Sequence, residues 1–355
     1  MVKEVEGTYK VEGLDLYTKS WLPDSDPVAK LLIVHGFSDH SGNYHEMAVW
    51  LAERGIAVHS FDQRGWGRNV KRSADRGLCG GTDKVMGEIA GFIRSHLPAA
   101  PNCPVFVMGH SMGGGNVAWL CTDPALEEDV LKQVRGFMLN APFIDFPPET
   151  RPGTVKVVLG RLAARLLPHQ HLKHIIPLEM MTHDAQRVQQ FRDDKLCHDT
   201  GTLESMAALL DRHLILAPGK VLVRPGVRSL WLGHGTEDVG ADYGAAKRWF
   251  EMQTAVQDKT FKTYEGWYHV LHCEVGKEEF FADVRDWILA RCGDGAAAAA
   301  QSEAVRKEEE GKPVEVVESA EAKKVLAEEA KEEADAVKDA EVVGKADSAA
   351  SGSKL

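Results

Sequence analysis

The chain has 355 residues, of which 44% are hydrophobic and 27% charged, and its formal net charge at pH 7 is −11. These proportions are ordinary for a soluble globular protein with one large domain or two small ones. The charge is uneven, since residues 294–355 hold 16 acidic and 9 basic residues. Neither part has the broad basic surface that nucleic-acid binding requires.

Cysteine usage and apolar runs narrow the class further. The 6 cysteines form no C-x-x-C pair, which argues against a zinc ribbon or a disulfide framework and suits a reducing compartment. The charged N-terminus has no apolar core of the kind found in secretory signals. No apolar run approaches the roughly eighteen residues of a membrane span, so we expect none.

Short apolar runs alternate with helical patterns along the chain. The first twenty residues lack this alternation and predict an antiparallel hairpin at a sheet edge. We expect strands at residues 31–34, 56–61, 105–108, 136–139, 229–232 and 262–264, and helices at residues 44–54, 84–97 and 116–121. Continuous apolar strands that alternate with amphipathic helices predict an α/β fold, in which helices cover both faces of a mostly parallel sheet.

The alternation is interrupted at about residues 142–212, which predicts a cap inserted into a domain of residues 1–293. One helical face there carries Val155, Val158, Leu159, Leu162 and Leu166. Residues 151–178 contain no acid but include Arg151, Lys156, Arg161, Arg165 and Lys173. Two interpretations stay open: docking at an anionic membrane or droplet surface, or packing on the core with solvated arginines. His169, His171 and His174 have no carboxylate or cysteine at ligand spacing, so we expect a polar loop and no metal.

Residues 294–355 contain no aromatic residue and are rich in Ala, Glu, Lys and Val. This composition predicts a disordered acidic tail, with transient helix at residues 320–337 as the alternative. The chain ends in Ser353, Lys354 and Leu355, the tripeptide that a peroxisomal import receptor reads. We therefore expect the protein in peroxisomes, with the cytoplasm or lipid droplets as alternatives.

A serine between glycines follows the apolar run at residues 105–108. Gly109-x-Ser111-x-Gly113 fits the nucleophile elbow, a sharp strand-to-helix turn that exposes a serine hydroxyl above a sheet. A Cβ at either glycine would collide with the neighbouring strand or helix. The alternative is a turn of small residues that only packs a helix on a strand.

A nucleophilic serine needs a base and a group that orients this base, here in the chain order serine, acid, histidine. Asp238 follows the strand at 229–232 and is the expected acid, with Glu237 as its competitor. His269 follows the strand at 262–264 and is preferred over His272, which is better placed in a pocket wall. We expect the oxyanion donors to be the N–H groups of Met112 and Phe37, unless the His35-Gly36-Phe37 segment is only a turn.

The segments HGFSDHSGNY, GHSMGG, GTED and YEGWYHVLHCE together resemble the monoacylglycerol lipase branch of the α/β-hydrolases, over roughly residues 20–292. The resemblance implies an α/β-hydrolase fold, the triad and the oxyanion donors named above. It also implies that Asp39, Asn43 and His272 bind the glycerol end of the substrate. This chain departs from the family pattern there, because Asp39 is a shorter acid and Asn43 replaces an arginine. The segment DQRGWG also resembles a family turn, and we expect it to be structural.

These patterns together predict a serine hydrolase that cleaves a long-chain fatty acid ester, with monoacylglycerol as the expected substrate. No metal or organic cofactor is implied. A peroxisomal acyl-CoA thioesterase or a lysophospholipase-type esterase would use the same triad, and these remain the enzymatic alternatives. The alternative of a different class is a non-catalytic scaffold that binds partners through its acidic tail.

Overall fold

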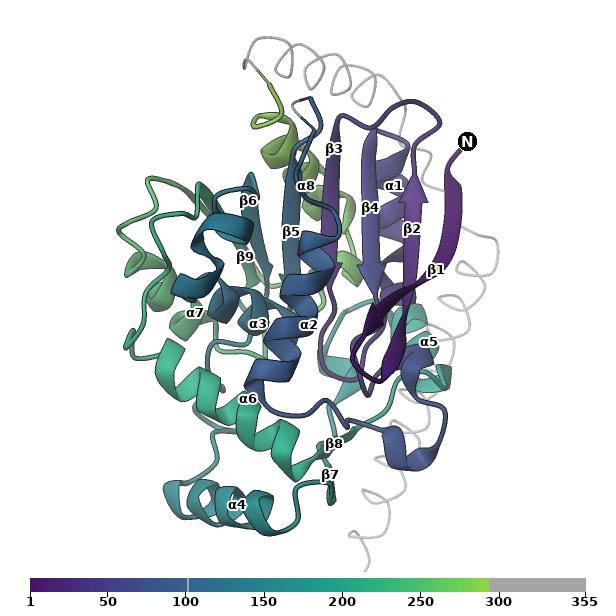
Figure 1. Ribbon diagram of the computed structural model, residues 1–355. Helices are drawn as coiled ribbons and strands as arrows, with labels where there is room; N and C mark the ends of the chain where they lie inside the picture. Colours follow the sequence, from purple (N-terminus) through teal and green to yellow (C-terminus); the bar gives the residue numbers. More distant parts are fainter. Residues whose placement is uncertain (101, 294–355) are drawn as a thin grey trace, which may run out of the picture. The chain divides into compact units, whose positions relative to one another are not determined.

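The computed structural model describes residues 1–100 and 102–293 (Figure 1). The predicted acidic tail at residues 294–355, including Ser353, Lys354 and Leu355, lies outside the described residues. The disorder expected for this tail and its reading by an import receptor therefore stay predictions.

A mostly parallel sheet of 8 strands forms the centre of the described chain. Its strands are β1 (Lys3–Val11), β2 (Leu14–Leu22), β3 (Ala29–Val34), β4 (Ile56–Phe61), β5 (Val105–His110), β6 (Gly136–Asn140), β9 (Ser229–Gly235) and β10 (Asp258–Tyr264). Their order is β1-β2-β4-β3-β5-β6-β9-β10. The β1–β2 and β2–β4 pairs are antiparallel, and the other neighbouring pairs are parallel. The predicted α/β sheet and its edge hairpin are confirmed.

Helices cover both faces of this sheet, as Figure 1 shows. They are α1 (His45–Ala52), α2 (Thr82–Arg94), α3 (Met112–Leu120), α7 (Tyr243–Glu251) and α8 (Glu278–Leu289). The helix expected at residues 84–97 ends at Arg94, and tight turns continue the chain to Leu97. Pro98 has no N–H that could bond to the carbonyl of Arg94, so the α-helical hydrogen bonds cannot continue here.

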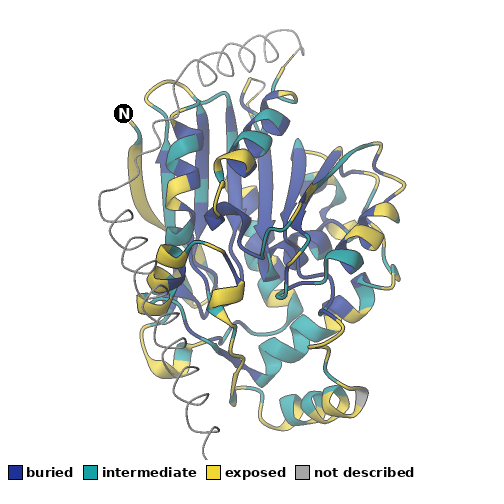
Figure 2. Ribbon diagram, turned by 180° about the vertical axis from the view of Figure 1, so that it is seen from behind, coloured by how far each residue is buried: buried dark blue, intermediate teal, exposed yellow. Residues whose placement is uncertain are grey.

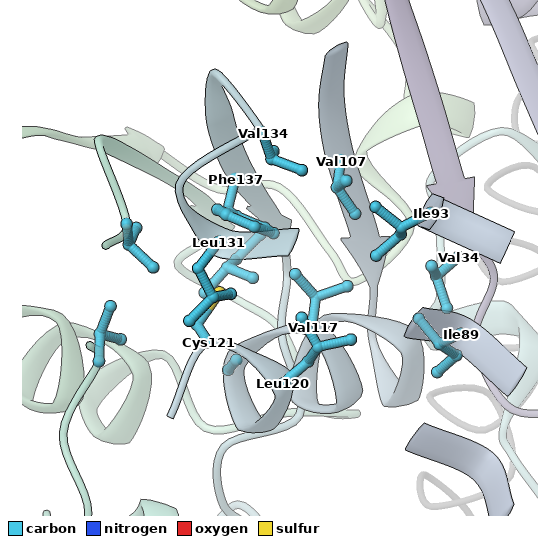
Figure 3. Packing of buried hydrophobic residues seen from close by; sticks show 14 of the residues in the cluster. Val34, Ile89, Ile93, Val107, Val117, Leu120, Cys121, Leu131, Val134 and Phe137 are labelled. Atoms are coloured by element: carbon cyan, nitrogen blue, oxygen red, sulfur yellow. The ribbon is translucent and has the colours of Figure 1, made fainter. Parts of the chain in front are cut away.

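Each face has its own apolar core because side chains alternate along a strand. In β5, Val105 and Val107 join the cluster that contains α2, α3 and α7, whereas Phe106 and Met108 join the cluster that contains α1 and α8. Figure 3 shows the first of these clusters, where Val107 and Phe137 of the sheet lie over Val117 and Leu120 of α3. The central strands β3, β4, β5, β6 and β9 are buried almost throughout, whereas the edge strand β1 is mostly exposed (Figure 2). These buried strands form a rigid base for the loops at their ends.

The segment between β6 and β9 forms the cap. It contains α4 (Thr154–Leu166), β7 (His171–Lys173), α5 (Ala185–Asp193), β8 (Thr200–Thr202) and α6 (Leu203–Leu216). The predicted boundary near residue 212 falls inside α6, whose Leu216 packs in the core of the sheet. Figure 1 shows α4 at the lower end of the view, with α6 between it and the sheet. None of the helices in the described residues is long and apolar enough to cross a membrane.

Candidate active site

Ser111 stands at the turn between β5 and α3, at the carboxyl end of the central strands. Its backbone has φ 52° and ψ −118°, a left-handed conformation that non-glycine residues rarely adopt and that stores strain. A Cβ on Gly109 would lie 2.3 Å from the carbonyl oxygen of Gly113, and a Cβ on Gly113 would lie 2.2 Å from that of Val34. The two glycines therefore let α3 approach β5 and β3, which is the arrangement of a nucleophile elbow.

The structure brings Ser111, Asp238 and His269 into one hydrogen-bonded chain. His269 Nε2 lies 2.7 Å from Ser111 Oγ, and His269 Nδ1 lies 2.7 Å from Asp238 Oδ2. Asp238 comes from the loop after β9 and His269 from the loop after β10. The competing acid, Glu237, is exposed. The geometry therefore favours Asp238 as the group that orients the histidine.

The Asp238 carboxylate is buried and accepts several hydrogen bonds. Its Oδ1 accepts the backbone N–H groups of Gly240 and Ala241 at 2.7 and 2.9 Å. Burial opposes ionisation, but the positive charge that His269 can carry and the hydrogen bonds from His234 and His269 hold the pKa of Asp238 below its ordinary value. An ionised Asp238 accepts from Nδ1–H, which leaves the Nε2 lone pair of His269 free to accept the serine proton.

His234 is a further neighbour of Asp238 that the sequence analysis did not single out. Its Nε2 lies 2.9 Å from Asp238 Oδ2, so that this oxygen is shared by two histidines. His234 is fully buried at the end of β9. Its position four residues before Asp238 was visible in the sequence, but the bend that brings the two side chains together was not.

The two expected oxyanion donors flank Ser111. Met112 begins α3, and Phe37 follows β3 in the loop whose Gly36 would place a Cβ 3.2 Å from Ser111 Cβ. Within the described residues, no acceptor is hydrogen-bonded to the backbone N–H of either Met112 or Phe37. Both N–H groups are therefore available to an anionic oxygen that forms beside Ser111.

Two cavities of different character meet at Ser111. A cavity of about 1560 Å³ is lined mainly by apolar side chains of α4, α6 and the loop around residue 176, and it also touches Asp238. A second cavity of about 300 Å³ has a mixed lining, with polar side chains such as Asp39 and Asn43 and apolar side chains such as Ile175, Met181 and Phe191. Phe37, Ser111 and His269 line both cavities. An ester at Ser111 would thus lie between a large apolar cavity and a smaller one that also offers polar groups.

Asp39, Asn43 and His272, the predicted alcohol-binding residues, all line the smaller cavity. Asn43 Nδ2 donates to Asp39 Oδ1 at 2.8 Å. His272 accepts at Nδ1 from Asn140 Nδ2 at 3.2 Å, and its ring stacks on Tyr44 with 4.4 Å between centroids. Burial is the main cause that lowers the pKa of His272 well below its ordinary value, so this ring is neutral.

His110 also lines the smaller cavity, and its ring lies 5.0 Å from that of His269. Burial, and then the nearby His269, lower the pKa of His110 to about 3. Its Nδ1 lies 3.2 Å from the carbonyl oxygen of Asn140, which only accepts, so the proton is on Nδ1. The His110 ring is held neutral beside His269.

Asp194 and Cys197 line the smaller cavity and form a mixed cluster with His40. The possible ligand atoms of these three residues lie within 4.8 Å of one another. His40 and Asp194 are nevertheless 154 positions apart in the sequence. His40 Nε2 hydrogen-bonds to Asp194 at 2.7 Å, and Cys197 Sγ accepts from Asn43 at 3.6 Å. All three groups already bind one another or a neighbour, and we assign no metal to them.

Comparison with known proteins places this geometry in a family. The family profile described as "Serine aminopeptidase, S33" matches residues 25–276. The chain belongs to this family. A Schizosaccharomyces pombe protein named "Putative monoglyceride lipase" is 32% identical over 282 residues, which cover 77% of this chain and 71% of that protein. The human monoglyceride lipase is 27% identical over 289 residues, which cover 81% of this chain and 91% of that enzyme.

A solved structure supports the fold. A soluble variant of the Saccharomyces cerevisiae monoglyceride lipase, in complex with a substrate analogue, superposes with a TM-score of 0.70. The match has 19% sequence identity and covers 79% of this chain and 93% of that one. At this identity the likeness bears on the fold alone. The predicted α/β-hydrolase fold and the predicted hydrolase family are both confirmed.

Proposed function

We propose that the chain hydrolyses the ester bond of a monoacylglycerol and releases a fatty acid and glycerol. The observation that carries the proposal is the position of Ser111 where a cavity of about 1560 Å³ with an apolar wall meets one of about 300 Å³ whose wall also holds the polar groups of Asp39, Asn43 and His272. A monoacylglycerol has the matching shape, with one long acyl chain and one small polyol joined at the ester. The names of the relatives at 27 and 32% identity support the same substrate.

The reaction follows from the geometry at Ser111. Ser111 Oγ attacks the ester carbonyl carbon while His269 Nε2, 2.7 Å away, takes the hydroxyl proton. The N–H groups of Phe37 and Met112 stabilise the tetrahedral oxyanion. The C–O bond to glycerol then breaks, and His269 gives its proton to the leaving oxygen. A water molecule, deprotonated by the same histidine, attacks the acyl-enzyme and releases the fatty acid.

The thioesterase alternative fits the cavities less well. A coenzyme A leaving group is several times larger than glycerol, and the smaller cavity of about 300 Å³ would hold only its end. Arg161 is one of the cap cations that would have to meet the phosphates of coenzyme A, but it forms an ion pair with Asp211 of α6. A lysophospholipid has a charged head group, which is also larger than glycerol.

One comparison tests the substrate. The purified protein is given 1-oleoylglycerol, oleoyl-CoA and oleoyl lysophosphatidylcholine, which share one acyl chain, with the Ser111→Ala variant as the control. We expect the highest kcat/KM for 1-oleoylglycerol. A higher value for oleoyl-CoA would replace the proposal by the thioesterase. Failure of a fluorophosphonate probe to label Ser111 would favour the scaffold alternative.

We also propose that the cap meets a lipid surface through α4. The predicted apolar face of this helix, residues Val155, Val158, Leu159, Leu162 and Leu166, is between 54 and 74% exposed. Val155 and Leu159 also line the larger cavity. An exposed apolar stripe beside cations is typical of a helix that lies in a membrane interface. Substrate would then pass from the lipid into the cavity along this face.

A peroxisomal location remains a proposal that rests on Ser353, Lys354 and Leu355 alone. A fluorescent reporter that carries the last ten residues of the chain is expected to enter peroxisomes. A reporter that stays diffuse in the cytosol would contradict this location.

A further inference from the structure

Asp39 lies in the wall of the smaller cavity, yet its carboxylate is hydrogen-bonded to groups of its own chain. Its Oδ2 accepts the backbone N–H of Gly36 at 3.0 Å and the hydroxyl of Tyr44 at 2.7 Å. Its Oδ1 accepts the backbone N–H of His40 at 2.7 Å and the amide of Asn43 at 2.8 Å. An ionised carboxylate offers about four acceptor sites. All of them are therefore occupied, and the side chain is only 8% exposed.

The groups that Asp39 binds belong to the loop that carries the oxyanion donor Phe37. The peptide between His35 and Gly36 is held at both ends, because Gly36 N–H donates to Asp39 and the His35 carbonyl accepts from Gln63 Nε2 at 2.7 Å. Ser38 in the same loop has φ 56°, a strained conformation that needs surrounding contacts to persist.

The next peptide, between Gly36 and Phe37, contains the donor N–H itself. His35 Nε2 lies 2.8 Å from the backbone N–H of Gln63, which can only donate, so the ring proton is on Nδ1. This Nδ1–H lies 2.8 Å from the Gly36 carbonyl oxygen. Because a peptide is planar and trans, fixing this carbonyl aims the Phe37 N–H in the opposite direction. Asp39 and His35 thus hold consecutive peptides of the loop.

We propose, on the basis of the serine-hydrolase mechanism above, that Asp39 is a positioning residue of the oxyanion hole and does not bind the leaving alcohol. It acts through Gly36 on the direction of the Phe37 N–H. Its ionised state supports the role: burial opposes ionisation, yet the pKa of Asp39 lies below its ordinary value, and the hydrogen bond from the Asn43 amide is among the causes. A charged acceptor binds a backbone N–H more strongly than a neutral one.

Two esters with the same acyl chain test the proposal: 1-decanoylglycerol, and a p-nitrophenyl decanoate whose leaving group has no hydroxyl for Asp39 to bind. In Asp39→Asn we expect kcat to fall by about 10–100-fold for both esters, while KM stays nearly unchanged. The upper limit of this fall is the loss of kcat seen when one oxyanion donor is removed. Tyr44→Phe, which removes one of the four hydrogen bonds, should lower both rates less, by about threefold to tenfold.

Asp62→Asn is the matched control. Asp62 is also fully buried and accepts the backbone N–H groups of Ser41 and Arg68, but it contacts neither Gly36 nor Phe37. Both aspartate variants should lose thermal stability, and only Asp39→Asn should lose kcat with the aryl ester. A boronic acid inhibitor that mimics the tetrahedral intermediate should bind Asp39→Asn more weakly by the same factor.

A loss confined to 1-decanoylglycerol, or a rise in KM without a fall in kcat, would overturn the proposal and make Asp39 an alcohol-binding residue. An unchanged kcat for both esters would overturn it as well. Wild-type activity on the aryl ester alone would instead remove the monoacylglycerol substrate, and the aryl ester would still report on Asp39.

Discussion

The carboxyl end of the sheet around Ser111, here called the catalytic end, and the cap differ in the side chains that they bury. The catalytic end buries polar side chains, whereas the cap exposes large apolar ones. Around Ser111, charged and polar side chains such as Asp39, Asp238 and His269 are less than 10% exposed and form hydrogen bonds with neighbours. In α4, large apolar side chains are more than half exposed. The residues proposed for catalysis are therefore held in a rigid, hydrogen-bonded part of the molecule. The cap leaves the apolar face of α4 exposed, and an apolar substrate would arrive along this face.

The largest effect is expected at the catalytic end. Ser111→Ala should lower kcat by about 10³–10⁶-fold, because the attacking oxygen is removed while the oxyanion donors and the cavities remain. Covalent labelling by a fluorophosphonate should disappear. The melting temperature should stay the same or rise, because alanine removes a polar group at a strained position and the loss should be confined to the reaction. A variant that keeps more than a tenth of the wild-type rate would show that Ser111 is not the nucleophile.

The strands, the turn at Ser111 and the order of the residues that meet there were predictable from the sequence. The strands at β4 and β5 and the serine between Gly109 and Gly113 follow from apolar runs and from glycine positions, which are local signals. The order of Asp238 and His269 along the chain, after two late strands, was sufficient to select them. The structure then brings these groups within 2.7 Å of their partners.

The parts that sequence did not predict depend on which side chains meet across long separations. The link between His40 and Asp194 spans 154 positions. The sequence placed Asp39 beside the substrate by resemblance, but it could not show that four donors of its own loop already surround the carboxylate. Likewise, the period of apolar residues in α4 predicted an apolar face, but not whether the core covers it, and both interpretations had the same pattern.

His234 allows a test of whether the hydrogen bonds to the buried Asp238 carboxylate contribute to kcat. Its Nε2 hydrogen bond to the buried Asp238 carboxylate is of the charged kind, worth about 1.5–3 kcal/mol. His234→Leu should therefore lower kcat by about 10–100-fold, whereas His234→Gln, whose amide can reach the position of Nε2, should recover most of the rate. Equal losses in the two variants would show that the ring is needed only for packing. The readout is kcat with a soluble short-chain aryl ester.

The proposed role of the exposed apolar face of α4 is tested most directly by replacing its apolar side chains with polar ones. Val158 and Leu162 are 56 and 54% exposed and do not line the larger cavity. Changing both to serine should weaken binding to anionic phospholipid vesicles by about tenfold or more, because each apolar side chain contributes about 1–2 kcal/mol when it leaves water. Hydrolysis of a soluble short-chain ester should not change.

The matched control for this variant is Val5→Ser with Val275→Ser. These two side chains are 39 and 62% exposed and lie outside the cap, on β1 and before α8. The control should bind vesicles like the wild type. Equal vesicle binding by the cap variant and the wild type would remove α4 as the lipid-binding surface, and equal weakening in the control would assign the effect to general surface hydrophobicity.

The smallest effect concerns the fit between the cap and the acyl chain. Ala207 of α6 lines the cavity of about 1560 Å³, so a larger side chain there would enter empty space and shorten the room for the chain. Ala207→Trp should lower kcat/KM for an 18-carbon monoacylglycerol by about fivefold to tenfold, a barrier change of about 1–1.4 kcal/mol, and leave an 8-carbon substrate unaffected. Measuring both chain lengths in one competition assay separates this shift from a loss of folded protein, which would lower both rates equally. An unchanged ratio between the two substrates would mean that the acyl chain does not pass α6, and the larger cavity would then have to hold another part of the substrate.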